Sequence, residues 1–158
     1  MLDTRRIQSG STNSFWTRFS GFTPNSKAGL PTEFKRLARH MCWVPNSDEW
    51  RKYREEAYTS EFEFWYGSDS TKLERWQQLC EEVGISPAPP SITKCRKALR
   101  GVHINLVDLV NCRRSGFGRP RRFQSYQQLR NYTLNRRTYP KEAAKKEGFI
   151  KELLRVLL

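Results

Sequence analysis

Aromatic residues and positive charge are concentrated in opposite halves of this sequence. Of the 20 Phe, Trp and Tyr residues, 14 lie before residue 77. Residues 1–90 hold 12 Lys and Arg against 12 Asp and Glu, whereas residues 91–158 hold 17 against 4. The whole net charge of +13 therefore comes from the second half. This segregation predicts a packed aromatic first half and a cationic second half, whose field attracts a polyanion such as nucleic acid.

Apolar residues recur at helical spacing in segments that are separated by Gly and Pro. Ser, Thr or Asn stands at the start of several of these segments, followed in three cases by Glu or Gln at the capping-box spacing. The predicted helices begin at Thr32, Asn46, Thr71, Ser91, Asn105, Ser125 and Pro140. A strand at "VHINLV" is an alternative to the start of the helix from Asn105. We predict a mainly α fold, a compact bundle of about five to six short helices with a disordered N-terminal tail.

The predicted organisation is a tail followed by one helical domain. Residues 1–14 form the disordered tail, and residues 15–158 form the domain, because 158 residues suit a single core. Within it, an aromatic, charge-balanced half spans 15–84 and a basic half spans 91–158, with the Pro-rich "ISPAPPS" between them. Phe15, Phe19 and Phe22 are expected to form an apolar arm that docks on the body. The sequence has no apolar run long enough to suggest a membrane span.

Residue types that commonly form catalytic and metal sites are few in this sequence, or their spacing matches no recognised motif. Cysteines at 42, 80, 95 and 112 match no zinc module, and the last three fall on apolar helix faces, where buried structural thiols belong. The two histidines stand in no nucleophile or metal motif, and the E-x-x-K spacing after Pro140 is typical of a solvated helix face. We therefore expect a non-enzymatic protein with no metal, no cofactor and no small-molecule substrate.

The most basic stretch is "RRSGFGRPRRF", residues 113–123, which holds five arginines and no acid. We expect these arginines to hold phosphates; they are Arg113, Arg114, Arg119, Arg121 and Arg122. The triplet Gly118-Arg119-Pro120 resembles the core of an AT-hook, which lies in the minor groove of A·T-rich DNA. A nuclear-import signal or a plain phosphate clamp is the favoured interpretation, since Phe117 stands where a hook has another Arg.

The helix predicted from Ser125 suits base recognition. Its pattern turns Tyr126, Leu129 and Tyr132 to one side. The polar residues expected on the outer side, or just beyond, are Gln127, Gln128, Arg130, Asn131, Arg136 and Arg137. Gln, Asn and Arg make bidentate contacts with A and G edges. A helix-turn-helix around Gly101 is a weaker interpretation, because its second helix is rich in Leu and Val and suits a core.

Most of the chain resembles a set of small fungal proteins of unassigned function. The resemblance begins at about Phe15 and rests on the pattern "FSGFTP…EFKRLAR…W…WRKYREEAYTSEF…YG…LERWQQLC…GI…PPSITKCRKAL…VHINLVDLVNCRRSG". It implies a compact intracellular fungal protein. No site residue is carried over from it.

These observations lead to a prediction with two alternatives. We predict a nuclear, non-enzymatic protein that binds DNA or RNA through its C-terminal half. One alternative is a protein–protein interaction module, in which the basic surface meets an acidic partner or the Phe15–Phe22 arm docks on another protein. The other is a mitochondrial or ribosome-associated basic protein, based on the Arg and Ser content of the N-terminus.

Overall fold

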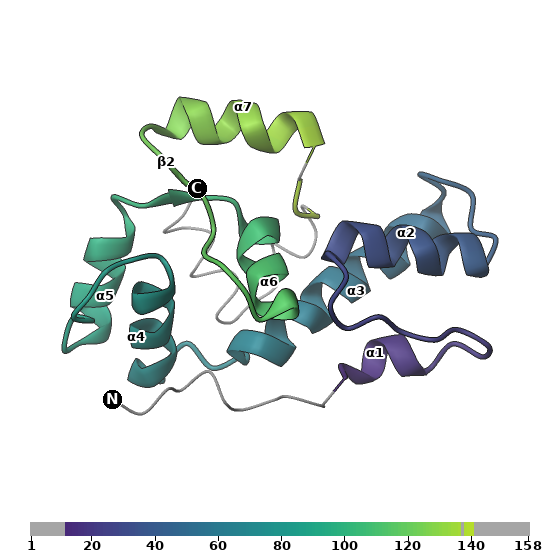
Figure 1. Cartoon of the computed structure of the whole chain (residues 1–158), viewed down its shortest axis with the longest axis horizontal. Coiled ribbons are helices and arrows are strands. Elements are labelled where there is room, and N and C mark those ends of the chain that lie inside the picture. The colour runs from purple at the N-terminus through teal and green to yellow at the C-terminus, as the bar shows by residue number, and fades with distance from the viewer. Residues whose placement is uncertain (1–11, 137, 141–158) are drawn as a thin grey trace.

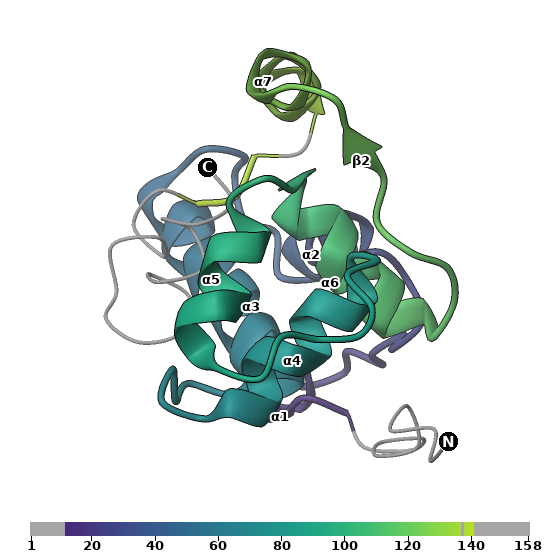
Figure 2. The ribbon, with the colours of Figure 1, turned by 90° about the vertical axis from the view of Figure 1, so that its left-hand side faces the viewer.

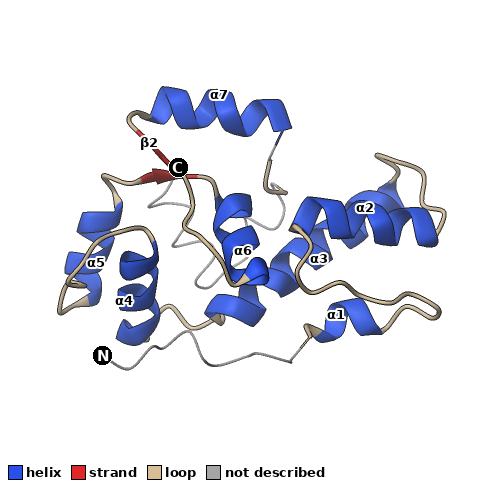
Figure 3. Cartoon of the chain, in the orientation of Figure 1, coloured by secondary structure: helices blue, strands red, loops and turns tan. Residues whose placement is uncertain are grey.

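The structure, a computed structural model, describes residues 12–136 and 138–140. This part of the chain contains seven helices and one small antiparallel sheet, so the prediction of a mainly helical fold is confirmed (Figures 1 and 3). The elements in chain order are α1 (Ser14–Thr17), α2 (Leu30–His40), α3 (Asp48–Tyr66), α4 (Leu73–Glu82), α5 (Ile92–Leu99), β1 (His103–Ile104), α6 (Leu106–Ser115), β2 (Arg122–Phe123) and α7 (Tyr126–Arg136).

Three predicted helix starts are confirmed by their caps. Ser91 Oγ accepts a hydrogen bond from the Lys94 amide at 3.3 Å, and Asn105 Oδ1 accepts one from the Asp108 amide at 3.1 Å. Ser125 Oγ accepts from the Gln128 amide at 3.2 Å. Each bond satisfies an amide that has no partner within the first turn of its helix.

Two predicted caps are wrong, although the helices themselves are present. Asn46 has a left-handed backbone with φ of 65°, and the cap of α3 is Ser47, whose Oγ accepts from the Trp50 amide at 3.2 Å. The residue before α4 is Lys72, which makes no side-chain cap. Thr71 instead hydrogen-bonds to the Asp69 carboxylate, in a local turn that competes with helix capping.

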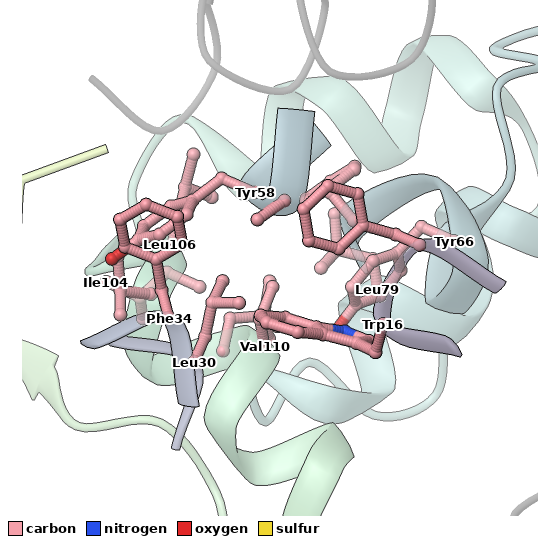
Figure 4. Packing of buried hydrophobic residues seen from close by; sticks show 14 of the residues in the cluster. Trp16, Leu30, Phe34, Tyr58, Tyr66, Leu79, Ile104, Leu106 and Val110 are labelled. Atoms are coloured by element: carbon pink, nitrogen blue, oxygen red, sulfur yellow. The ribbon is translucent and has the colours of Figure 1, made fainter. Parts of the chain in front are cut away.

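Helices from both halves of the chain surround one core. α6 packs against α2 and α3, α1 lies along α3, and α4 and α5 lie side by side (Figures 1 and 2). The core joins the ring of Trp16 with side chains from the middle of the chain, as Figure 4 shows from close by. Buried members labelled there are Trp16, Leu30, Phe34, Tyr58, Tyr66, Leu79, Ile104, Leu106 and Val110. The aromatic core is therefore completed by aliphatic residues of the basic half.

The Phe15–Phe22 arm docks on the body as predicted. Phe15, Phe19 and Phe22 are buried, and the ring of Phe19 makes edge contacts with Trp43 and Tyr53. The three rings of the arm are therefore used in packing within the folded body.

The predicted end of the tail is wrong by two residues. Asn13 is buried and caps α1 by accepting a hydrogen bond from the Phe15 amide at 3.1 Å, and Ser14 begins that helix. Both belong to the folded body because the Asn13 side chain also reaches α3. Residues 1–11 lie outside the described residues, and so does the helix predicted from Pro140, except for Pro140 itself.

The "VHINLV" segment contains a strand and then a helix. His103 pairs with Phe123 and Ile104 with Arg122 in a two-stranded antiparallel sheet, and α6 begins two residues later. Both alternatives weighed from the sequence therefore apply, each to part of the segment. Among the described residues, no helix is long and apolar enough to cross a membrane.

Candidate nucleic-acid interface

The end of α6 buries an arginine that the sequence assigned to the interface. The Arg114 side chain is 2% exposed, and its Nη1 lies 2.6 Å from Glu61 Oε1 in α3. Its Nε donates to the Ala28 carbonyl oxygen at 2.6 Å, and its Nη2 donates to the Asn25 carbonyl oxygen at 2.9 Å. The prediction that Arg114 holds a phosphate is wrong, because its guanidinium is used inside the protein.

Glu61 is the centre of this buried network. Besides Arg114, its carboxylate accepts hydrogen bonds from Asn13 Nδ2 at 3.0 Å, Trp16 Nε1 at 2.7 Å and Trp65 Nε1 at 3.0 Å. A buried ion pair offsets its desolvation only when the remaining polar atoms also find partners, and here four donors surround one carboxylate. The network ties α1, α3, α6 and the 25–28 turn together.

Arg113 is also paired within the protein. Its guanidinium forms an ion pair with Glu82 at the end of α4, with both side chains only about one-fifth exposed, and lies 5.2 Å from the centre of the Tyr66 ring. Tyr66 donates its hydroxyl to the same Glu82 carboxylate at 2.8 Å. Burial raises the pKa of that hydroxyl above its ordinary value, against the opposing effect of the Arg113 charge. Arg113 therefore joins α6 to α4, and its assignment as a phosphate contact is corrected too.

Gly116 stops helix α6 after Ser115, and this stop separates the buried arginines from the exposed ones. Gly116 has a left-handed backbone with φ of 68°. Its amide donates to the Arg113 carbonyl oxygen, and the Phe117 amide donates to that of Cys112. These two bonds form a Schellman motif, which turns the chain away from the helix axis. The loop that follows runs from Gly116 to β2 along the outside of the molecule (Figure 2).

The three arginines of this loop are at the surface. Arg119, Arg121 and Arg122 are all exposed, as predicted. Arg119 and Arg122 approach each other across Gly84, since a Cβ at Gly84 would lie within 4 Å of a terminal nitrogen of each. Arg121 lies over the Phe123 ring, 4.8 Å from its centre. The sequence between Arg113 and Phe123 has no acid that could neutralise them.

An open groove of about 380 Å³ runs beside this loop. Arg119 and Arg121 line it together with Lys27, which comes from the 25–28 turn of the first half. The one carboxylate in the lining is Asp108, and Tyr132 of α7 donates its hydroxyl to it at 2.7 Å. The remaining lining residues are Gly29, Asn111, Cys112, Ser115 and Pro120. Three cations against one carboxylate give the groove a positive balance.

The side chain of Cys112 lines this groove. Burial raises its pKa, and the negative charge of Asp108 raises it further. A thiol is a weaker nucleophile and metal ligand than a thiolate. The buried thiols Cys80 and Cys95 pack between α4 and α5, as expected for structural cysteines.

Helix α7 carries the predicted polar residues on its outer side. Gln127, Gln128, Arg130 and Asn131 are exposed, and Gln127 Nε2 donates to Asn131 Oδ1 at 3.0 Å. Gln128 Oε1 accepts from the Gln124 amide at 3.1 Å, so that this residue also helps to fix the start of α7. The helix lies at the edge of the molecule and is held through β1 and β2 (Figures 1 and 2).

The inner side of α7 is narrower than predicted. Leu129 is buried and Tyr132 is partly buried, as expected, but Tyr126 is 50% exposed. Among the described residues, α7 packs mainly on β1 and β2, and this packing leaves Tyr126 in its first turn half exposed. The side chain of Arg136 and the whole of Arg137 lie outside the described residues.

The AT-hook interpretation does not suit this conformation. Pro120 is buried and lines the groove, whereas a hook must be able to enter a narrow DNA groove along its full Arg-Pro unit. The helix-turn-helix interpretation fails for the reason given from the sequence, because Leu106, Val107 and Leu109 of α6 are core residues.

Sequence reasoning missed Lys27 as part of the site. This residue lies in "PNSKAGLP", far from the arginines in sequence, and reaches the groove because Arg114 holds the neighbouring carbonyl groups. The pattern contained no signal for it beyond a lysine in a turn. A long-range contact of this kind is visible only once the fold is known.

Comparison with known proteins adds no assignment. No protein-family model matches the chain, and no curated protein or solved structure shows significant similarity to it. Within the described ranges, no three His, Cys, Asp or Glu side chains gather in a way that could hold a metal ion. The resemblance to small fungal proteins stays a prediction.

Proposed function

We propose that this chain is a non-enzymatic nucleic-acid-binding protein whose phosphate contacts are Arg119, Arg121 and Arg122. The observation that carries the proposal is the exposure of these three arginines on one loop, beside a groove with a positive balance. Phosphate groups account for most of the affinity of such proteins, and Arg binds them through charge and directed hydrogen bonds. Arg113 and Arg114 are not part of the proposed surface.

The position of α7 supports a second kind of contact. Its exposed amide and guanidinium groups, which include those of Gln127, Arg130 and Asn131, directly follow the basic loop in the chain. Side chains of these types can hydrogen-bond to base edges, whereas phosphate contacts fix only the position of the protein. We propose that α7 contacts bases while the loop holds the backbone, and that the protein acts in the nucleus.

The test is a salt titration of binding to labelled duplex DNA, single-stranded DNA and structured RNA. The variant replaces Arg119, Arg121 and Arg122 with Gln. Its control replaces three exposed cations of the first half, Lys35, Arg39 and Arg51, so that both variants lose the same charge. We expect the slope of log K against log salt to fall by about two to three contacts in the loop variant only.

Two outcomes would overturn the proposal. The first is an absence of binding to all three nucleic acids near physiological salt. The second is an equal loss in both variants, which would mean that the net charge acts without a defined site. Either result would favour an acidic protein partner for the basic surface, because such a partner needs the charge but not the phosphate geometry.

A further inference from the structure

The basic loop presents one large aromatic ring to solvent. Phe117 is 83% exposed, the largest value among the exposed large apolar side chains that the structure describes. The others are Met41, Val44, Tyr126 and Leu134. An exposed ring on a loop leaves apolar surface in water, so its presence suggests a bound state in which the ring is covered.

The Schellman motif makes this exposure more informative. The residue after the left-handed glycine in such a motif usually packs an apolar side chain back onto the helix. Phe117 occupies that position, with its amide bonded to the Cys112 carbonyl oxygen at 3.2 Å, but its ring does not pack there.

The main chain at Phe117 is nevertheless held on both sides. Ser115 Oγ lies 3.2 Å from the carbonyl oxygens of both Phe117 and Cys112, which share its one proton, and the Phe117 amide donates to the Cys112 carbonyl oxygen. The glycines on either side, Gly116 and Gly118, both have positive φ, of 68° and 78°. The position of the ring's Cα–Cβ bond is therefore set before any partner binds, which lowers the entropy lost on binding.

We propose that Phe117 is a stacking platform for an unpaired nucleobase, with the phosphates on either side of that base held by Arg119 and Arg121. This inference rests on the proposed function and names its ligand class as single-stranded nucleic acid. Every base has a face that can stack on an aromatic ring, and arginines beside such rings hold the backbone. Ser115 stands two positions before Phe117, Arg119 stands two positions after it, and both line the basic groove. A base stacked on the ring therefore has its phosphate close to the groove.

The charges of the loop favour a single strand over a duplex. A ring can also enter a duplex as a wedge, but separating two stacked base pairs costs about a few kcal/mol and is repaid by wrapping more DNA onto the protein. Because Arg113 and Arg114 are paired internally, the loop keeps three arginines for this purpose. An unpaired base needs no such opening, and Arg119 and Arg121 then need only hold the phosphates on either side of it.

The test uses the full chain and 12-nucleotide single-stranded DNA and RNA, one base of which is 2-aminopurine, whose fluorescence falls when it stacks. A duplex of the same sequence is the second probe. The variants are Phe117→Ala, which removes the ring, and Phe117→Leu, which keeps a branched apolar side chain but has no aromatic face. Val44→Ala is the matched control, because Val44 is 68% exposed and lies in the turn between α2 and α3.

We expect Phe117→Ala and Phe117→Leu to raise Kd for the single strands by about 5-fold to 150-fold, the range for one stacked base. Both should also abolish the fall in fluorescence and leave the salt slope unchanged, because no charge is removed. Val44→Ala should match the wild type, and the duplex should be affected less than the single strands.

Other results separate failure of this inference from failure of the proposed function. Binding with a normal salt slope that is indifferent to Phe117→Ala overturns the stacking role alone. Full affinity in Phe117→Leu overturns it as well, since an apolar contact would then be enough. An equal loss on the duplex replaces the single-strand proposal with a wedge. An absence of binding by the wild type overturns both proposals.

Discussion

Arg113 and Arg114 close α6, and Arg119, Arg121 and Arg122 lie in the loop that follows. The two groups belong to one run of eleven residues and differ in what their charges meet. The first pair is matched by Glu82 and Glu61, carboxylates that come from the charge-balanced half of the chain. The loop arginines are exposed, and no carboxylate stands near them in sequence.

The comparison teaches that the count of arginines in a basic run does not give the charge at the surface. Arg113 and Arg114 precede the helix stop, so the directions of their side chains are set by α6. One face of α6 packs against α3. Residues after Gly116 are released from that direction, because the left-handed glycine turns the chain outward. One run therefore supplies both internal ties and a candidate binding surface.

The largest expected effect is on the free energy of unfolding, and it distinguishes the internal arginines from the loop arginines. Arg114→Ala should lower the free energy of unfolding by about 3–5 kcal/mol, because it leaves the Glu61 carboxylate buried without its cation. Urea denaturation followed by Trp fluorescence measures the change. Arg119→Ala is the control and should change it by less than about 0.5 kcal/mol. Similar values for the two variants would mean that Arg114 is not the internal tie described here.

A smaller effect is expected for the half-buried pair. Arg113→Gln should cost about 1–3 kcal/mol, because Glu82 loses a charged partner but keeps the hydroxyl of Tyr66. Urea denaturation again gives the value, and Tyr66→Phe, which removes only the hydroxyl, sets the scale of a hydrogen bond from an uncharged donor to the same carboxylate. A cost for Arg113→Gln that equals that of Arg114→Ala would contradict the difference in burial.

The helix stop itself is the next target. Gly116→Ala should cost about 1–2 kcal/mol, because an L-residue is strained at φ of 68° although no atom lies within 4 Å to obstruct the new Cβ. Gly101→Ala provides the control, since Gly101 has no positive φ and a Cβ there would make only an ordinary contact, with the Ala98 carbonyl oxygen at 3.8 Å. Equal stabilities of the two variants by thermal unfolding would show that the left-handed conformation is not required.

The smallest effect on stability accompanies a clear effect on binding. Arg119→Gln should leave the free energy of unfolding within about 0.5 kcal/mol of the wild type, because its side chain is exposed. It should reduce the salt slope of nucleic-acid binding by about one contact. A stability loss above about 1 kcal/mol would place Arg119 with the internal arginines instead.

The helices α2 to α7 and the starts of three of them could be predicted, because these features depend on neighbouring residues; the short α1 was not predicted, and α2 begins at Leu30 and not at Thr32. Ser91, Asn105 and Ser125 cap their helices through amides three residues away, and such patterns are visible in the chain. The burial of Arg114 was not predictable in this way. It depends on Glu61, 53 residues distant, and on two carbonyl groups of a turn even farther away.

The candidate site was likewise predictable where it depends on neighbouring residues, and not where it depends on long-range contacts. The exposure of the loop arginines and of Gln127, Arg130 and Asn131 followed from local composition and helical phase. The exposure of Tyr126 and the arrival of Lys27 at the groove did not, because each depends on which elements lie next to α7 and the loop.

The bonds of Arg114 also bear on whether the two halves can exist apart. One guanidinium from the basic half holds a carboxylate and two turn carbonyls of the aromatic half. A chain cut between residues 84 and 91 would strand an uncompensated carboxylate in one fragment and an uncompensated cation in the other. The break in charge composition along the sequence is thus not a place where this protein can be divided, and the two fragments should regain structure only when mixed.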